Sequence, residues 1–399
     1  MKCDETLYAR ICGISLCAIL ISGVIFPRFM AYSPAIFGLL AFVSFRGVYG
    51  FWPEISKYLA LALGGILTLA AASSLWAITP EIALERSTKL APLFLGAVLI
   101  ISWARSLPLP CVEKITKITL YGFLLAVAIA AFDALTAGAM HYALRPHKIN
   151  PGFENLSNLN RGVVIAMLSG LVFVPYLALR KEYKWLALAC LSLLPMIAIT
   201  HSQSAQLSVI AAAIMFVAFP YRFKPAWIAS AVVLGGLIIS GPFIAGWLYD
   251  SLAAPLASND WASTQASASA RMEIWMTIAQ RALENPILGH GVEATRAMED
   301  LEMPLLYNPH QTVLHPHNFA LQTWVELGAV GAILIAVILG LFLQHLSSLE
   351  TVQAKIALPV FIGSIIIAVI AYGMWQGWWL GLLTLIGALS VLSARAVKA

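Results

Sequence analysis

Charged residues are scarce in this sequence. Only 11% of its 399 residues are Asp, Glu, Lys or Arg, while 60% are hydrophobic. Soluble globular proteins have about a quarter charged and about half apolar residues, so the composition excludes that class and predicts a polytopic membrane protein. The net charge of +5 does not indicate nucleic acid, because the basic residues occur singly or in short groups between apolar runs. We therefore expect membrane lipids as partners and no nucleic acid.

Several motifs that carry common chemistries are also missing. The five cysteines show no CxxC or metal-ligand spacing, which argues against a disulfide framework. No glycine-rich phosphate loop and no GxSxG motif is present, so neither ATP chemistry nor serine hydrolysis is expected. The outward acidic residues form no DxD pair that would hold a divalent cation. We therefore expect a reaction that needs no metal and no other cofactor, and a metal site at His310, His315 and His317 is the less favoured alternative.

Long apolar runs, in contrast, are abundant. About twelve of them can cross a bilayer as helices, since a span needs roughly 20 residues. Their centres lie near Ala18, Leu39, Ile66, Gly96, Ala126, Leu168, Ala189, Ala213, Leu234, Ala332, Ile365 and Thr384. The second run is the least secure, because Pro34 and Arg46 shorten it. The sequence predicts an all-α integral membrane protein in which residues 1–399 form one transmembrane domain.

The positions of Lys and Arg predict the orientation. An even number of spans puts both termini on one side, and most basic residues fall in short segments on that side, so the positive-inside rule makes the termini cytoplasmic. Two outward loops are long, at residues 136–161 and 249–316, and the second is expected to contain short helices. All histidines except His345 are predicted to lie outward, so we expect the chemistry on that face.

The stretch HPHNFALQTWVELGAVG, residues 315–331, opens an apolar helix with polar side chains. Pro316 suits the first turn of a helix, which predicts that His317 and Asn318 lie in that turn. On a continuous helix Gly328 and Gly331 return to the His317 face, as a close-packing patch against a neighbouring helix, and Glu326 lies about 180° away. Either His317 acts as a base, with His315 as its neighbour, or both are interfacial polar residues.

Residues 269–291, SARMEIWMTIAQRALENPILGHG, predict a helix along the membrane surface. Its apolar stripe comprises Met272, Trp275, Ala279 and Ala282. Arg271 falls on the same side, where its guanidinium either snorkels towards water or binds a phosphate.

Further basic residues mark the outer ends of two other spans. Arg161 follows a group of asparagines that could cap the helix or bind a sugar: Asn155, Asn158 and Asn160. Arg86 and Lys89 share one helical face, and pairing with Glu81 or Glu85 is the alternative to a binding role.

Taken together, these segments resemble the bacterial O-antigen ligases. His317, Asn318, nine residues, Gly328, two residues and Gly331 match the H-[NSQ]-x9-G-x-x-G pattern of that family. Arg271 and Trp275 form an R-x3-W element, and NP-x2-G-x-G at 285–291 is similar to the segment before that histidine in the wider ligase and polymerase superfamily. The length, the twelve spans and the large loop also resemble the family.

The resemblance implies transfer of O-antigen polysaccharide from undecaprenyl pyrophosphate to a sugar hydroxyl of lipid A-core, at the periplasmic face of the bacterial inner membrane. It implies that His317 is the general base, that the reaction inverts the anomeric carbon, and that the large outward loops are periplasmic. The expected ligands of the pyrophosphate and sugars are Arg271, Arg161, Arg86, Lys89, His315 and Asn318.

One departure and three alternatives accompany the resemblance. Superfamily members often carry an S-R-[GA] signature where this chain has Ala205, so another outward arginine would have to replace that charge. An O-antigen polymerase would use the same donor, and a protein O-oligosaccharyltransferase would use a protein serine as acceptor. A secondary transporter, from a different class, would have charged or broken spans at the midplane and a two-half repeat.

Overall fold

A computed structural model describes residues 5–145, 159–200, 202–257, 268–298, 306 and 315–398. This part of the chain contains helices and no strand, which confirms the predicted all-α fold. The α-helices are α1 (Glu5–Ile25), α2 (Ser33–Tyr49), α3 (Lys57–Ala72), α4 (Pro80–Ser106), α5 (Leu109–Leu135), α6 (Ala139–Ala143), α7 (Asn160–Leu179), α8 (Tyr183–Ile199), α9 (Gln203–Ala218), α10 (Lys224–Ile239), α11 (Gly241–Ala257), α12 (Ala268–Glu284), α13 (Phe319–Ser347), α14 (Thr351–Ile370) and α15 (Gly377–Ala396). Short 3-10 helices are η1 (Pro27–Ala31), η2 (Ser73–Leu75) and η6 (Ala294–Arg296).

Most of these helices are long and apolar enough to cross a membrane. Among the described residues eight meet that test alone, namely α1, α3 with η2, α4, α5, α7, α13, α14 and α15. Helices α10 and α11 meet it only as a pair bent by 74°. The shorter apolar helices α2, α8 and α9 account for the remaining predicted runs. Each predicted run thus falls on a helix, and the chain is a multi-pass membrane protein.

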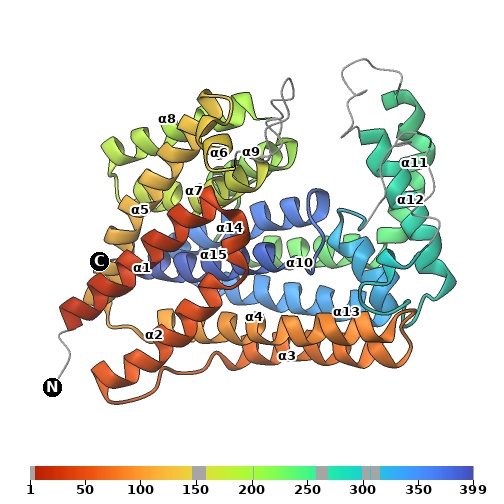
Figure 1. Cartoon of the computed structure of the whole chain (residues 1–399), viewed down its shortest axis with the longest axis horizontal. Coiled ribbons are helices and arrows are strands. Elements are labelled where there is room, and N and C mark those ends of the chain that lie inside the picture. Colours follow the sequence, from red (N-terminus) through yellow and green to blue (C-terminus); the bar gives the residue numbers. More distant parts are fainter. Residues whose placement is uncertain are drawn as a thin grey trace.

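Helix α7 lies at the centre of the bundle, where it packs against α1, α5, α8, α14 and α15. Most of its residues are buried, because its apolar side chains face other helices on every side. Phe173 of α7 stacks on Phe123 of α5, with ring centroids 4.9 Å apart. Both chain termini lie at the same end of the bundle (Figure 1).

At the other end, α11 and α12 pack on each other and cross the ends of the long helices (Figure 1). Helix α12 coincides with the surface helix predicted around residues 269–284. Its buried face is centred on Ile274 and Ile278, whereas Met272 and Trp275 of the predicted stripe are half-buried. The predicted outward loops 249–316 and 136–161 therefore contain α12 and α6 respectively, together with the end of α11 and the start of α7.

Helix α13 is interrupted at Gly328, where φ is 62° and ψ is −160°. The loop that follows α12 fills the interruption. His290 and Gly291 donate backbone hydrogen bonds to the carbonyls of Val325 and Glu326, at 2.9 and 2.8 Å. Beyond the interruption, the amides of Ala329 and Val330 donate to the carbonyls of Pro286 and Ile287.

The prediction of one continuous helix with a glycine patch packed on another helix was therefore wrong. A Cβ on Gly328 would lie 2.3 Å from the Ile287 carbonyl oxygen, and one on Gly289 would lie 2.5 Å from the Glu326 carbonyl carbon. Both glycines also have positive φ, which other residues rarely adopt. Gly328 in the histidine motif and Gly289 in the NP-x2-G-x-G segment thus allow the backbone of α13 and the backbone of the loop after α12 to contact each other.

Candidate functional site

His317 precedes α13 and does not lie in its first turn, contrary to the sequence prediction. Its φ is 53°, in the left-handed region. Asn318 is the N-cap residue, and its side-chain oxygen accepts hydrogen bonds from the amides of Ala320 and Leu321 at 3.0 and 3.2 Å. An asparagine cap satisfies the free amides of the first turn, so Asn318 begins the helix and Pro316 remains outside it. The indole of Trp275 donates to the Pro316 carbonyl at 2.9 Å, which ties α12 to this turn.

The hydrogen bond of His317 determines which ring nitrogen is free. Nδ1 lies 2.7 Å from the carbonyl oxygen of Ala371, which can only accept, so Nδ1–H donates to it. The lone pair is then on Nε2. Burial above all, together with the neighbouring His315 and Arg271, lowers the pKa of His317 to about 4, against the opposing effect of the Ala371 bond. The ring is therefore neutral near pH 7, with a nitrogen that can accept a proton.

His315 lies edge-on to His317, with ring centroids 4.2 Å apart. The side-chain oxygen of Gln376 accepts from the indole of Trp378 at 2.8 Å, so its amide nitrogen donates to Nε2 of His315 at 2.7 Å. Burial lowers the pKa of His315, and the charges of Arg296 and Arg161 lower it too. Nδ1–H of His315 is buried and has no hydrogen-bond partner among the described residues.

Two of the predicted arginines approach the histidines without a carboxylate partner in the described part of the chain. Arg271 of α12 is close enough for its charge to lower the pKa of His317, and burial lowers its own pKa. Arg161, the second residue of α7, lies over the ring of Trp378 at 5.5 Å from its centroid. The side-chain oxygen of Asn160 beside it is buried, caps no helix and has no partner among these residues. Asn155, Asn158 and His310 lie outside the described residues.

Arg86 is paired, although not with the predicted Glu81 or Glu85. Its Nε lies 2.6 Å from Oε1 of Glu293, whose other oxygen pairs with Nε of Arg296. These three residues line a cavity of about 80 Å³ together with His315, Gln322, Gly373, Trp375 and Gln376. Arg86, Arg296 and Glu293 together carry one net positive charge beside His315.

Lys89 is the one predicted residue that stays apart from this group. It is exposed and pairs with Glu85 four residues earlier on α4. That pair is the alternative considered from the sequence, and an exposed pair of this kind adds little stability.

Several residues of the site carried no sequence signal. Glu293 and Arg296 belong to a turn without periodicity, and Trp375 and Gln376 fall in the short connection before α15. The one indication was Ala205, which stands where superfamily members often carry an arginine, so that another basic residue was expected to supply the charge. Ala205 is buried in α9. Arg296 lies in the wall of the cavity beside His315.

Glu326 supports the site from within α13. It is fully buried, and its carboxylate accepts hydrogen bonds from the amide of Gln322 at 2.9 Å and from the indole of Trp375 at 2.5 Å. Gln322 in turn accepts from the backbone amide of Met374 at 2.9 Å. Glu326 is thus a hydrogen-bonding residue, and through Trp375 and Gln322 it holds the loop whose Ala371 carbonyl orients His317.

Comparison with known proteins gives the family. Residues 186–336 match the family described as O-antigen ligase. A protein of Rickettsia bellii named "Putative polysaccharide ligase" is 27% identical over 276 residues, which are 67% of this chain and 64% of the relative. A Rickettsia conorii protein of the same description is 39% identical over 129 residues, 31% of each chain, and one from Rickettsia felis is 33% identical over 128 residues, 31% of each chain.

These matches span between 31% and 64% of the relatives' own length. No solved structure matches. The family match runs from α8 to beyond the Gly328 interruption, so it includes Arg271, both histidines and the Glu293 turn. The resemblance seen in the sequence is confirmed, since residues 186–336 match the O-antigen ligase family and these relatives are named polysaccharide ligases.

Proposed function

We propose that this protein is a polysaccharide ligase of the bacterial inner membrane. It transfers O-antigen polysaccharide from undecaprenyl pyrophosphate to a sugar hydroxyl of lipid A-core, at the periplasmic face. The observation that carries the proposal is a neutral histidine, whose Nε2 is free, near a half-buried guanidinium that has no carboxylate partner among the described residues. A buried cation without a partner is costly, which favours an anionic ligand at this position.

In the proposed reaction, the acceptor hydroxyl attacks the anomeric carbon of the donor from the face opposite the pyrophosphate. A bond forms between the acceptor oxygen and that carbon, and the bond from the carbon to the phosphate oxygen breaks. The proton of the hydroxyl passes to Nε2 of His317, and the pyrophosphate leaves with the electron pair. One direct displacement inverts the configuration.

The arginines stabilise the charge that grows on the leaving pyrophosphate. A planar guanidinium matches a phosphate with two hydrogen bonds, and such charge-assisted bonds are the strongest available to a side chain. Arg271 and Arg161 are free to make them. Arg86 and Arg296 already share Glu293, so they contribute one net charge and a rigid wall.

The test is reconstitution with undecaprenyl-pyrophosphate-linked glycan and purified lipid A-core, with and without EDTA. We expect wild-type transfer to persist in EDTA, His317→Ala to lose at least about a hundredfold in rate, and Arg271→Lys to be impaired because lysine lacks the planar fork. Arg281→Gln is the matched control, since Arg281 is on the same helix and pairs with Glu284. Undiminished transfer by His317→Ala would refute the base assignment, and glycan growth on the lipid carrier without lipid A-core product would identify a polymerase.

A further inference from the structure

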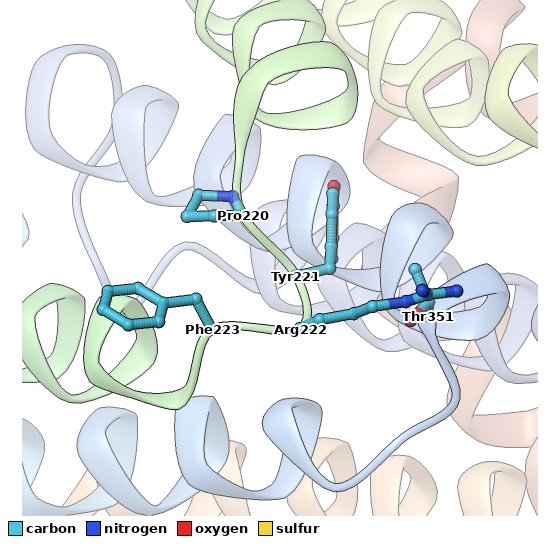
Figure 2. A pocket seen from close by; sticks show the side chains of 5 residues that line it. All are labelled: Pro220, Tyr221, Arg222, Phe223 and Thr351. Atoms are coloured by element: carbon cyan, nitrogen blue, oxygen red, sulfur yellow. The ribbon is translucent and has the colours of Figure 1, made fainter.

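A second cavity lies far from the histidines, where α9 turns into α10 and α14 begins. Its volume is about 440 Å³, and it is lined by Pro220, Tyr221, Arg222, Phe223 and Thr351. Figure 2 shows the side chain of Arg222 extending towards Thr351, while Tyr221 and Phe223 point to other sides. Helix α13 connects the two sites, because it starts just after His317 and ends just before Thr351.

The wall of this cavity is rigidly built. The hydroxyl of Tyr221 donates to the Met215 carbonyl at 2.8 Å, and the indole of Trp227 donates to the Tyr221 carbonyl at 3.0 Å. Phe219 packs edge-on against Trp227, with ring centroids 4.8 Å apart. These contacts fix the backbone of the turn that carries Arg222.

The charge around the cavity is positive and unbalanced. Arg222 has no hydrogen bond or ion pair with any described residue, and no acidic residue lines the cavity. Lys355 lies behind it, with its ammonium 5.4 Å from the ring of Phe216 and 5.7 Å from that of Tyr221. Glu350, beside Thr351 in sequence, is already paired with Lys398.

The surroundings favour a ligand that belongs to the bilayer. Val217 in the last turn of α9 and Ile228 in the second turn of α10 are 78% and 65% exposed, so apolar surface continues directly from the cavity. Aromatic and basic side chains at the boundary between such surface and water are typical of the lipid headgroup region. Basic pockets between spanning helices on the cytoplasmic side suit anionic headgroups, and the positive-inside rule predicts that side for this turn.

We propose that this cavity binds the phosphodiester headgroup of an anionic phospholipid, with Arg222 as its cationic ligand, Tyr221 as its aromatic floor and Lys355 as a second positive charge behind that ring. The acyl chains lie along α9 and α10. This site is separate from the transferase site and does not depend on the proposed reaction.

The test uses the full-length protein in mild detergent, with bound lipid counted by native mass spectrometry. We expect phosphatidylglycerol to be retained in preference to phosphatidylcholine. Arg222→Gln and Lys355→Gln should each weaken its retention by about fivefold, the effect of one basic residue near an anionic surface. Lys184→Gln, which removes an exposed charge at the start of α8, should leave retention unchanged.

Equal retention of phosphatidylglycerol and phosphatidylcholine by the wild-type protein would overturn the proposal, and this comparison needs no variant. So would equal losses in all three variants, because that result indicates a general surface charge. Displacement of phosphatidylglycerol by millimolar inorganic phosphate would show that the cavity takes a free anion and not a lipid. Transfer activity is measured in parallel, so a failure of the lipid site is distinguishable from a failure of the proposed enzyme.

Discussion

At the scale of single residues, His317 owes its protonation state to three features of its surroundings. The Ala371 carbonyl fixes the tautomer, burial removes the water that would stabilise a charged ring, and Arg271 adds a repelling charge. A base with a low pKa accepts a proton late, when the acceptor oxygen has already lost electron density to the forming bond. In the proposed reaction, proton transfer to His317 would therefore accompany cleavage of the bond to the pyrophosphate, whose charge the arginines would stabilise.

The low pKa predicts an unusual pH profile. Protonation blocks the base, and it begins only as the pH falls towards about 4. We therefore expect the transfer rate to hold between about pH 7 and 5.5 and to fall below about pH 5, whereas an unperturbed histidine near 6.5 would lose half its activity above pH 6.

The profile is measured as initial rates at saturating donor and acceptor, with circular dichroism at each pH to verify that the helices persist. A midpoint between pH 6 and 7 would contradict the buried, neutral state of His317.

The residues of the site differ in how far the sequence could reveal them. His317, Arg271 and Arg161 were named from their positions at helix ends and from the family pattern. Glu293, Arg296 and Gln376 could not be named, because they lie in turns whose approach to His315 depends on contacts between segments distant in sequence. Helical phase also misplaced His317 and Asn318, since it assumes a helix that begins at Pro316.

At the scale of elements, the interruption of α13 and the loop after α12 form one unit. Four backbone hydrogen bonds join residues 286–291 to residues 325–330. Apolar periodicity predicted α13 correctly but could not indicate the interruption, because both halves of the helix keep the same apolar character. The glycines of the two motifs were visible, and only the structure relates them to each other.

Gly328→Ala tests this unit. The added Cβ meets the Ile287 backbone at 2.3 Å and the residue keeps a positive φ, so we expect a loss of at least about 2 kcal/mol of stability. Gly340→Ala is the control, because it lies on the same helix with nothing within 4 Å of the new Cβ.

Thermal unfolding in detergent measures both variants. The Gly328 variant should unfold at a clearly lower temperature and the Gly340 variant at the wild-type temperature or above it. Equal unfolding temperatures would mean that the interruption relaxes without cost.

At the scale of the whole molecule, the helices divide the protein into two ends with different chemistry. The chain termini lie at one end, and α11 and α12 cross the other (Figure 1). The Trp275–Pro316 hydrogen bond holds the turn with the histidines against α12, whereas the Arg222 cavity lies where α9 turns into α10 and α14 begins. Composition and apolar runs predicted the membrane class and the helices well, because a bilayer demands length and apolarity from every span. The bend between α10 and α11 was not predicted, since both arms are equally apolar.

The orientation makes a direct prediction. Reporter fusions at the C-terminus and within residues 258–267 should report opposite sides, with green fluorescent protein fluorescent at the C-terminus and alkaline phosphatase active in the loop. The basic residues of the short connections provide the reason. Fluorescence and phosphatase activity on reversed sides would put the histidines in the cytoplasm and exclude a periplasmic reaction.

The interruption in α13 also bears on how the chain is assembled. A bare break in a spanning helix would leave amides and carbonyls without partners at a depth where water is scarce. Here the groups at the break are satisfied by residues 286–291, which precede α13 in the chain and so are synthesised before it. The partner for the break is therefore synthesised before α13, whereas the Ala371 carbonyl that orients His317 follows later in the chain.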